Sequence, residues 1–329
     1  MYMIKKSLIL MLLCFSIYAQ TRVKFAAFDG GGVRGVITLE IIQAIEKYGQ
    51  FSLSDQCAGF GGTSTGAIIA IGLALGIPAS ELSQYYQHLS SEVFAHGHPH
   101  LFHAQYDPHR FKEALLQLFH DKKISPDICL KDLPKKVVLP VLCLKDPENN
   151  RWEIKLLENF SEEGGQVKVT DAVVEVTSAP TFFPSSNGYI DAGVVVNNPS
   201  LATLAHAHQY YLMYDENINI DLLSIGTGFF EKYIEGNEDW GSVQWMTPVA
   251  LYHTAGAEPL INMMVDVSNY WITKLCYKLF PNSFHRINMK LSKNFTLDQV
   301  SAIPEMIQET QQYIKDHESY IQKISQWFK

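Results

Sequence analysis

Short apolar runs alternate with segments of helical periodicity along most of the chain. The predicted strands are Arg22–Phe28, which reads RVKFAAF, and residues 58–62, 136–144 and 222–225. The predicted helices are residues 33–48, 65–75 and 304–328, the last of them polar and amphipathic. Strands that alternate with helices in this way indicate an α/β fold with a largely parallel sheet. Because no segment reads as a linker, we predict one domain over residues 20–329.

Local chemistry refines three of these elements. Gly49 follows the first helix and suits the left-handed position at a helix C-terminus. Pro140 has no amide hydrogen, so the strand that contains it is expected near a sheet edge or a bulge. Residues 260–280 are rich in Met, Tyr, Trp and aliphatic side chains. They form either a core helix or a membrane-facing lid, and we favour the core helix.

The first 19 residues, MYMIKKSLILMLLCFSIYA, combine two lysines, a short apolar run and a final small residue. This pattern is typical of a secretory signal peptide cleaved after Ala19. The apolar run is shorter than the roughly 20 residues that a membrane-spanning helix needs. We therefore expect a secreted or periplasmic protein, with an uncleaved N-terminal anchor or a buried strand as the alternatives.

Composition and charge exclude several classes of protein. The chain has 329 residues, of which 47% are hydrophobic and 12% aromatic, and this excludes a disordered protein. Its formal charge is −8 and it has no basic run, which argues against nucleic acid as the main partner. The cysteines are scattered without CxxC spacing, so neither a disulfide framework nor a zinc site is expected.

A first glycine loop, GGGVRG at residues 30–35, follows a predicted strand and opens a predicted helix. That context suits a nucleotide-binding loop. The acidic residue that should end a second strand about 20 positions later is missing, and Asp29 would place a carboxylate next to a pyrophosphate. The loop alone is weak evidence for any ligand, and a nucleotide-binding module stays open as an alternative.

A second glycine loop, GTSTG at residues 62–66, lies between a short strand and an apolar helix. Such a turn holds its central serine, here Ser64, in a strained conformation at the N-terminus of the helix. Gly62 and Gly66 remove the side chains that would clash in the turn. The carboxyl ends of parallel strands meet at one edge of a sheet, so the amides of Gly31 and Gly32 can face an oxyanion formed by attack of Ser64.

A third segment supplies a carboxylate, because Asp191 follows a short Tyr189-Ile190 strand and precedes the small residues Ala192 and Gly193. The chain therefore carries, in order, the triple-glycine loop, GTSTG, TSAPTFFP, DAG followed by NNP, and LSIGTG. With these five motifs across residues 23–228 the chain resembles the patatin-like phospholipases. The resemblance is weaker over residues 229–329, where FHRI at 284–287 is also similar.

The resemblance implies a three-layer fold, with a mostly parallel sheet between helices and the serine on a nucleophile elbow. It implies a Ser–Asp dyad in which Ser64 is the nucleophile and Asp191 the base, with an oxyanion hole at Gly30, Gly31 and Gly32. Gly35, Gly62, Gly66 and Gly193 support the elbow and the loops. The expected activity is hydrolysis of acyl esters in phospholipids or other lipids, with peripheral membrane contact and without a metal or cofactor. Residues 229–329 form a helical C-terminal part.

Two points stay open at this stage. The family usually has glycine after the aspartate, and if that position needs a positive φ, Ala192 would misplace Asp191 at a cost of about 1–2 kcal/mol. Arg34 is a candidate phosphate contact, with a structural ion pair as the alternative. Two other classes of protein compete with the dyad enzyme: a non-catalytic lipid-binding protein on the same fold, and a Ser-His-Asp esterase whose histidine would be His206, His208, His253 or His285.

Overall fold

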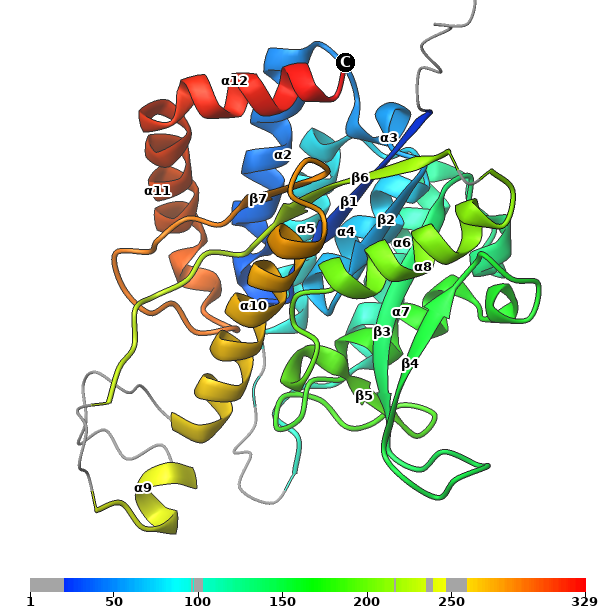
Figure 1. Ribbon diagram of the computed structural model, residues 1–329. Coiled ribbons are helices and arrows are strands. Elements are labelled where there is room, and N and C mark those ends of the chain that lie inside the picture. Colours follow the sequence, from blue (N-terminus) through cyan, green and yellow to red (C-terminus); the bar gives the residue numbers. More distant parts are fainter. Residues whose placement is uncertain (1–20, 96, 98–102, 216, 235–238, 247–258) are drawn as a thin grey trace, which may run out of the picture.

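The computed structural model describes residues 21–95, 97, 103–215, 217–234, 239–246 and 259–329, and the predicted signal peptide lies outside them. A seven-stranded sheet with the order β4-β3-β2-β1-β6-β7 crosses the molecule, and β5 pairs with β3 (Figure 1). The strands are β1 Arg22–Phe28, β2 Gly59–Gly62, β3 Lys136–Cys143, β4 Glu153–Glu158, β5 Tyr189–Asp191, β6 Asn219–Ile225 and β7 Phe284–Ile287. Only β4 and β5 run antiparallel to their neighbour, so the predicted, largely parallel sheet is confirmed.

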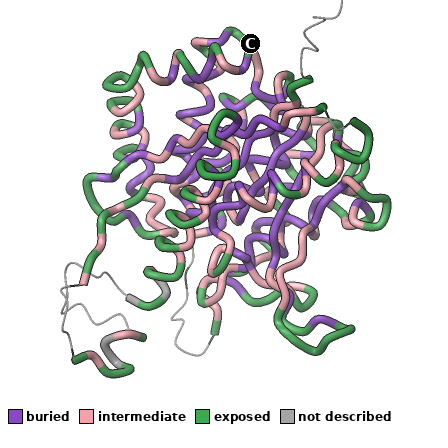
Figure 2. The backbone as a smooth tube through the Cα atoms, viewed as in Figure 1, coloured by how far each residue is buried: buried purple, intermediate pink, exposed green. Residues whose placement is uncertain are grey.

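Helices cover both faces of the sheet, which gives the three layers expected of this fold (Figure 1). They are α2 Gly35–Gly49, α3 Leu53–Gln56, α4 Thr65–Ala74, α5 Ala79–Val93, α6 His109–Lys122, α7 Val169–Thr177, α8 Ser200–Leu212, α9 Ser242–Met246, α10 Pro259–Leu279, α11 Ile303–Asp316 and α12 Glu318–Trp327. The buried residues concentrate along the strands and the helices packed on them (Figure 2).

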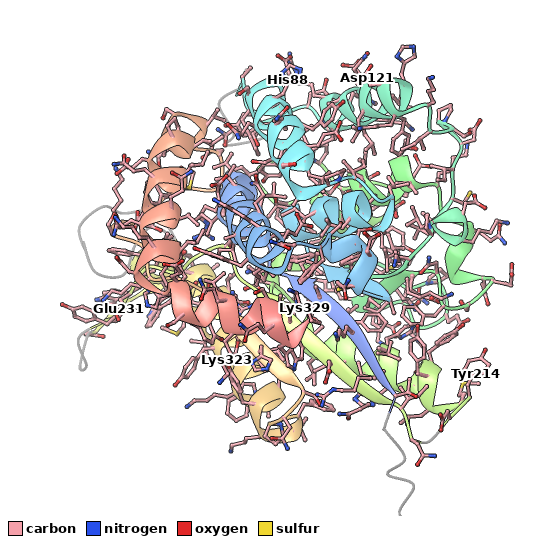
Figure 3. All side chains as sticks on the ribbon, turned by 90° about the horizontal axis from the view of Figure 1, so that it is seen from above. His88, Asp121, Tyr214, Glu231, Lys323 and Lys329 are labelled. Atoms are coloured by element: carbon pink, nitrogen blue, oxygen red, sulfur yellow. The ribbon has the colours of Figure 1, made fainter. Side chains whose placement is uncertain are left out.

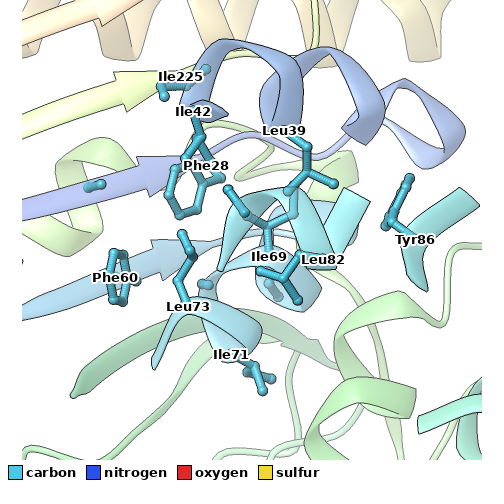
Figure 4. Close-up of a cluster of buried hydrophobic side chains, with 14 of the residues drawn as sticks. Phe28, Leu39, Ile42, Phe60, Ile69, Ile71, Leu73, Leu82, Tyr86 and Ile225 are labelled. Atoms are coloured by element: carbon cyan, nitrogen blue, oxygen red, sulfur yellow. The ribbon is translucent and has the colours of Figure 1, made fainter. Parts of the chain in front are cut away.

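Alternate residues of β1 face the two helical layers. Ala26 and Phe28 belong to a large core that α2 and α4 complete, whereas Phe25 and Ala27 belong to a smaller core with α8 and α10. Both faces of the sheet are therefore dry, as expected where parallel strands are covered on both sides. Every residue of α4 except Ile68 is buried, which explains why that helix is apolar all round (Figure 4).

The expectations for Gly49 and for the C-terminal helix are corrected, and the structure locates Pro140 at an interruption of the strand pairing. Gly49 is the last residue of α2, and the left-handed residue is Gln50, with φ 55°. Glycine is needed at 49 for space, because a Cβ there would lie 2.1 Å from the ring of Phe51. Pro140 lies in an internal strand, at the break where β3 stops pairing with β2 and before it begins to pair with β5. The expected C-terminal helix is two helices, α11 and α12, which His317 separates with φ −115° and ψ 26°.

The expectation that residues 260–280 form a core helix is wrong for one face of α10. Met264, Val267, Tyr270 and Trp271 are 51–61% exposed, whereas Cys276 on the opposite face is buried in the smaller core. The two sets alternate at helical spacing, so one apolar segment carries both a packed face and an outward one. In the described part of the chain, no helix combines the length and apolarity needed to span a bilayer.

Candidate active site

Ser64 lies in a sharp turn between β2 and α4. Its backbone has φ 54° and ψ −124°, a conformation that residues with a side chain rarely adopt. Two glycines make the turn possible by close backbone approach. A Cβ on Gly62 would lie 2.3 Å from the carbonyl oxygen of Gly66, and one on Gly66 would lie 2.1 Å from that of Phe28. The predicted strained elbow is therefore present, with Ser64 at the start of α4.

Strand β5 brings Asp191 to the same edge of the sheet. Strand β3 pairs with β2 up to Val138, opposite Gly61, and then with β5, where Val141 lies opposite Asp191. Ser64 is three residues after Gly61, and Val141 is three residues after Val138, which pairs with Gly61. Ser64 therefore lies near the level of Val141, the residue that pairs with Asp191. Strand β5 thus takes the place beside β3 that β2 leaves when the chain turns into α4.

Asp191 is a buried carboxylate, only 4% exposed. It accepts a hydrogen bond from the amide of Gly193 at 2.7 Å, and the hydroxyl of Ser64 is close enough to favour its ionised form. Burial raises the pKa of Asp191 to about 6, and the Ser64 hydroxyl and the Gly193 amide oppose the rise. A carboxylate with this pKa is a better proton acceptor near neutral pH than an exposed aspartate.

The first glycine loop, between β1 and α2, faces the cavity that contains Ser64 and Asp191. Gly30 is clamped: its amide donates to the carbonyl of Asn197 at 3.0 Å, and its carbonyl accepts from the hydroxyl of Thr227 at 2.8 Å. Within the described residues, the amides of Gly31 and Gly32 donate no hydrogen bond, and both residues line the cavity that contains Ser64. These two amides, rather than that of Gly30, are therefore available to an oxyanion.

Contacts from other elements fix the loop in place. Gly32 has φ 54°, and a Cβ there would lie 2.0 Å from the carbonyl oxygen of Leu297. The hydroxyl of Tyr86, on α5, hydrogen bonds to both Thr65 and the carbonyl of Gly32. Gly35 leaves room for this contact, because a Cβ there would lie 2.5 Å from the hydroxyl of Thr65. The loop and the elbow are thus coupled through one tyrosine.

Sequence reasoning missed three of these supporting residues: Asn197, Thr227 and Tyr86. Asn197 lies in the NNP motif, and Thr227 lies in the GTG motif that follows β6. Both motifs supported the family resemblance, but neither pattern indicated a contact with the glycine loop. Tyr86 stands in an ordinary helical pattern that carries no local sign of its contact.

Asp29, immediately before the loop, is also buried and is paired with Arg286 from β7. One guanidinium nitrogen of Arg286 donates to Asp29 at 2.7 Å and to the hydroxyl of Ser224 at 2.6 Å, and a second nitrogen completes the pair. Burial raises the pKa of Asp29, and the guanidinium opposes that rise. FHRI, the segment of weaker resemblance, therefore supplies the partner of the residue that starts the glycine loop.

Ser64, Asp191, Gly31 and Gly32 all line one cavity of about 370 Å³, which we call the main cavity. Its polar floor is at the sheet edge. Its walls carry aromatic side chains from several segments, namely Phe94, Phe111, Phe182, Phe183 and Phe295. A polar reacting centre inside an apolar wall is the arrangement expected for an ester with a hydrocarbon tail.

Two cations reach the main cavity. Arg34 lines it, donates to the carbonyl of Gly31 at 3.3 Å and interacts electrostatically with Asp266 of α10. Lys232 also lines it and pairs with Asp266 at 3.1 Å. Burial lowers the pKa of Arg34, while the neighbouring carboxylates oppose that shift. Arg34 and Lys232 thus both interact with Asp266, which also lines the main cavity.

The candidate histidines of a triad lie elsewhere. His206 is beside Glu158, His208 stacks on Phe280, and His285 packs against Trp327. No histidine among the described residues lines the main cavity, and His253 lies outside those residues.

Ala192 does not require the positive φ that would have made it costly. It starts a 3-10 helix, Ala192–Val194, and is absent from the residues with positive φ. Its side chain is fully buried, so the position requires a small residue. The departure from the usual glycine leaves Asp191 in place.

Comparison with known proteins agrees with this arrangement. The sequence model of the family described as patatin-like phospholipase matches residues 26–204. Protein teg of Priestia megaterium is 25% identical over 306 residues, which cover 87% of this chain and 93% of that protein. The cGAMP-activated phospholipase of Vibrio cholerae is 26% identical over 211 residues, covering 57% of this chain and 58% of its own length.

A third relative is the rat 85/88 kDa calcium-independent phospholipase A2. It is 24% identical over 344 residues, which cover 91% of this chain and 39% of the rat protein. The family match extends over more than half of the chain and includes the glycine loop, the elbow and Asp191. This chain belongs to the patatin-like phospholipase family.

Proposed function

We propose that this protein is a lipid acyl hydrolase that cleaves carboxylic esters of phospholipids or related lipids with a Ser64–Asp191 dyad. Its hydrolytic class follows from the family, and the relatives named above include phospholipases. The observation that carries the dyad is the interaction of the Ser64 hydroxyl with the buried carboxylate of Asp191 in one cavity, beside two amides without a partner in the described structure.

Each step of the reaction has a group to perform it. Asp191 accepts the proton of Ser64 as its oxygen attacks the ester carbonyl, and the amides of Gly31 and Gly32 donate to the oxyanion. When the tetrahedral intermediate collapses, the leaving alcohol takes the proton from Asp191 and the acyl group stays on Ser64. Water then attacks the acyl-enzyme, Asp191 accepts its proton, and the free acid is released as Ser64 is reprotonated.

Two cations in the lining of the main cavity favour a phospholipid over a neutral ester. Arg34 presents a guanidinium there, which binds phosphate oxygens in a bidentate manner, and Lys232 adds a second cation. We propose Arg34 as the main phosphate contact. Substituting Arg34 with Met should lower kcat/KM for a phospholipid more than for a neutral p-nitrophenyl ester, and an equal loss on both would argue against this role.

Labelling with an alkyl fluorophosphonate tests the dyad directly, because the reagent reacts only with an activated serine. We expect labelling and hydrolysis of p-nitrophenyl butyrate by the wild-type chain, and neither by the Ser64→Ala variant. Asp191→Asn should also lose both. Ser325→Ala, which removes a buried serine of α12 outside the main cavity, is the matched control and should remain active. Labelling that survives in Ser64→Ala would overturn the assignment.

Assays of vesicle binding and of nucleotide binding, run beside the labelling, distinguish the enzyme from the other classes of protein. A non-catalytic lipid-binding protein would bind vesicles without turnover that depends on Ser64. A nucleotide-binding module would bind NAD or ATP and ignore the fluorophosphonate.

We further propose that the outward face of α10 provides the peripheral membrane contact. Leu260, Met263, Met264, Val267, Tyr270 and Trp271 are exposed and lie on one side of the helix at i, i+3, i+4 spacing. Lys274, with its amine 4.5 Å from the ring centroid of Tyr270, and Lys278 continue this face. Aliphatic, aromatic and lysine side chains on one face are typical of helices that lie in a membrane interface.

A matched pair of variants tests this contact. Met264→Ser combined with Tyr270→Ser removes a methionine and a tyrosine from α10, and Met213→Ser combined with Tyr214→Ser removes the same residue types from the exposed turn directly after α8. We expect only the α10 variant to bind phospholipid vesicles more weakly, while both hydrolyse a soluble ester normally. Equal vesicle binding by both variants would exclude α10.

We propose in addition that residues 20–329 form one catalytic domain that is exported after removal of residues 1–19. Support comes from the signal-peptide pattern of those residues and from β7, which joins the sheet next to β6 although it lies far along the chain. N-terminal sequencing of the protein recovered outside the cytoplasm should begin at Gln20. A start at Met1 would contradict cleavage.

A further inference from the structure

A second cavity lies between α5 and α6 and above α4. Its volume is about 170 Å³, and we call it the side chamber. Helix α4 provides its floor with Ile69, Ile71 and Gly72, together with Leu75 directly after the helix, and Leu39 of α2 and Leu82 of α5 extend the apolar lining. In Figure 4, Leu39, Ile69 and Leu82 form a group next to Tyr86.

The side chamber and the main cavity share a wall. The same four side chains, Ile68, Tyr86, Leu89 and Phe111, line both of them. The two cavities are therefore separated by a single layer of side chains. Tyr86 is fixed by its hydrogen bonds to Thr65 and Gly32, whereas the other three make apolar contacts that a change of rotamer can alter.

The chamber extends away from the reacting serine along α4. This helix begins at Thr65, directly after Ser64, and its residues from Ile68 to Leu75 follow one another past the shared wall into the chamber. At about 1.5 Å per residue, Ser64 and Leu75 are roughly 16 Å apart along the helix axis. A linear group attached to the oxygen of Ser64 is therefore aligned with the chamber, and it enters when Ile68, Leu89 or Phe111 changes rotamer and opens the shared wall.

The lining of the chamber selects the kind of group. Its inner residues are aliphatic or aromatic, and polar side chains stand at the outer end, where His88, Gln117 and Asp121 occur. His88 and Asp121 are exposed, and Figure 3 shows them at the periphery of the molecule. An apolar channel without a charged group inside suits a hydrocarbon chain and gives no partner to a phosphate or a sugar.

We propose that the side chamber binds the distal part of the substrate acyl chain and thereby makes the enzyme selective for long-chain acyl esters. This inference rests on the proposed function, because it assigns the acyl group on Ser64 to a defined channel. Each methylene that enters the chamber should raise kcat/KM about fourfold, the factor that corresponds to roughly 0.8 kcal/mol per buried methylene. The gain should end when the chain reaches the polar rim.

Filling the chamber without touching the main cavity tests the proposal. Ala114 of α6 lines only the side chamber and is half-buried, so Ala114→Trp adds an indole there. Ala205→Trp on α8, an exposed alanine on the opposite face of the sheet, is the matched control. Hydrolysis is measured with a series of p-nitrophenyl esters from butyrate to palmitate.

We expect Ala114→Trp to lower kcat/KM for palmitate about tenfold or more, the equivalent of roughly two buried methylenes, and to leave butyrate unchanged. Ala205→Trp should leave both unchanged. Leu75→Trp, at the far end of the floor, is a second variant that should act in the same way if Ala114→Trp does not fold. A preference for palmitate over butyrate that neither variant alters would overturn the inference.

The ester series also distinguishes failure of the proposed function from failure of the side-chamber inference. If the wild-type chain hydrolyses no ester in a Ser64-dependent manner, the proposed function fails. If butyrate is hydrolysed through Ser64 and the series shows no dependence on the chamber variants, only the side chamber is excluded.

Discussion

Arg286 of β7 reaches past β6 to form a buried ion pair with Asp29, the residue that joins β1 to the glycine loop. Arg286 is in register with Ser224 of β6, which is itself in register with Ala27 of β1, and its guanidinium also donates to the Ser224 hydroxyl. The C-terminal third of the chain therefore takes part in holding the loop, although its resemblance to the family is weaker.

Removing Arg286 should destabilise the protein strongly. Arg286→Met leaves the carboxylate of Asp29 buried without a partner, and breaking a buried pair in this way costs about 3–5 kcal/mol. Urea unfolding at neutral pH should show a lower midpoint, with the free energy of unfolding reduced by that amount. Asp29→Asn combined with Arg286→Met should recover much of the loss, and a double variant that is no more stable than Arg286→Met would contradict the assignment.

Activity should depend on pH through Asp191. The reaction needs this carboxylate ionised, and burial raises its pKa to about 6, so kcat/KM should increase with pH and level off above about 6. Below that value it should fall about tenfold per pH unit. A pH profile of soluble ester hydrolysis measures this. A profile that stays flat down to about pH 4, the ordinary value of an aspartate, would argue against Asp191 as the base.

The same shift has a consequence for stability. Because the folded state binds the proton of Asp191 more tightly than the unfolded state, the free energy of unfolding falls as pH rises from about 4 to 6. Above about pH 6 the ionised carboxylate costs up to about 3 kcal/mol. Asp191→Asn should therefore be inactive yet more stable than wild type at about pH 8, with the difference vanishing near pH 3.5. Lower stability at pH 8 would contradict this.

Backbone strain at Ser64 should be measurable. Ser64→Gly relieves the strain of φ 54° and ψ −124°, whereas Ser64→Ala keeps the Cβ that causes it. Both variants should be inactive. After subtracting the greater flexibility of glycine in the unfolded chain, we expect Ser64→Gly to be about 1 kcal/mol more stable than Ser64→Ala in thermal or urea unfolding. Equal stability would mean that the elbow is not strained.

The histidines should be dispensable for catalysis. Substituting His206, His208, His253 or His285 singly with Asn should leave ester hydrolysis close to wild type, since the three that are described lie away from the main cavity. Loss of a general base would reduce the rate on the order of 100- to 10,000-fold. A folded variant with a loss of that size would support a Ser-His-Asp triad instead of the dyad.

Several elements could be predicted because their causes are local. Strand β1 has the predicted bounds, and β2 and β6 end where apolar runs meet glycine loops. The elbow at Ser64 follows from its own flanking glycines. Parallel strands then bring the two loops to one edge without further information.

Other parts could not be predicted because they depend on partners far along the chain. Strand β5 pairs with the part of β3 that extends beyond the end of β2. The sequence of neither strand indicates this pairing. The clamp on Gly30 joins β1 to residues near 197 and 227. Helix α10 is apolar on two faces, and the sequence alone does not show which face is buried. The packing shows that the smaller core covers the face with Cys276.

The conformation of Ala192 bears on how distant relatives are recognised. A search pattern that insists on glycine directly after the aspartate would discard this chain, although the turn there uses a backbone geometry open to any L-residue. What the position excludes is volume, since its side chain is fully enclosed. A search pattern that admits alanine or serine at this position would also find chains that lack the usual glycine but keep the dyad geometry.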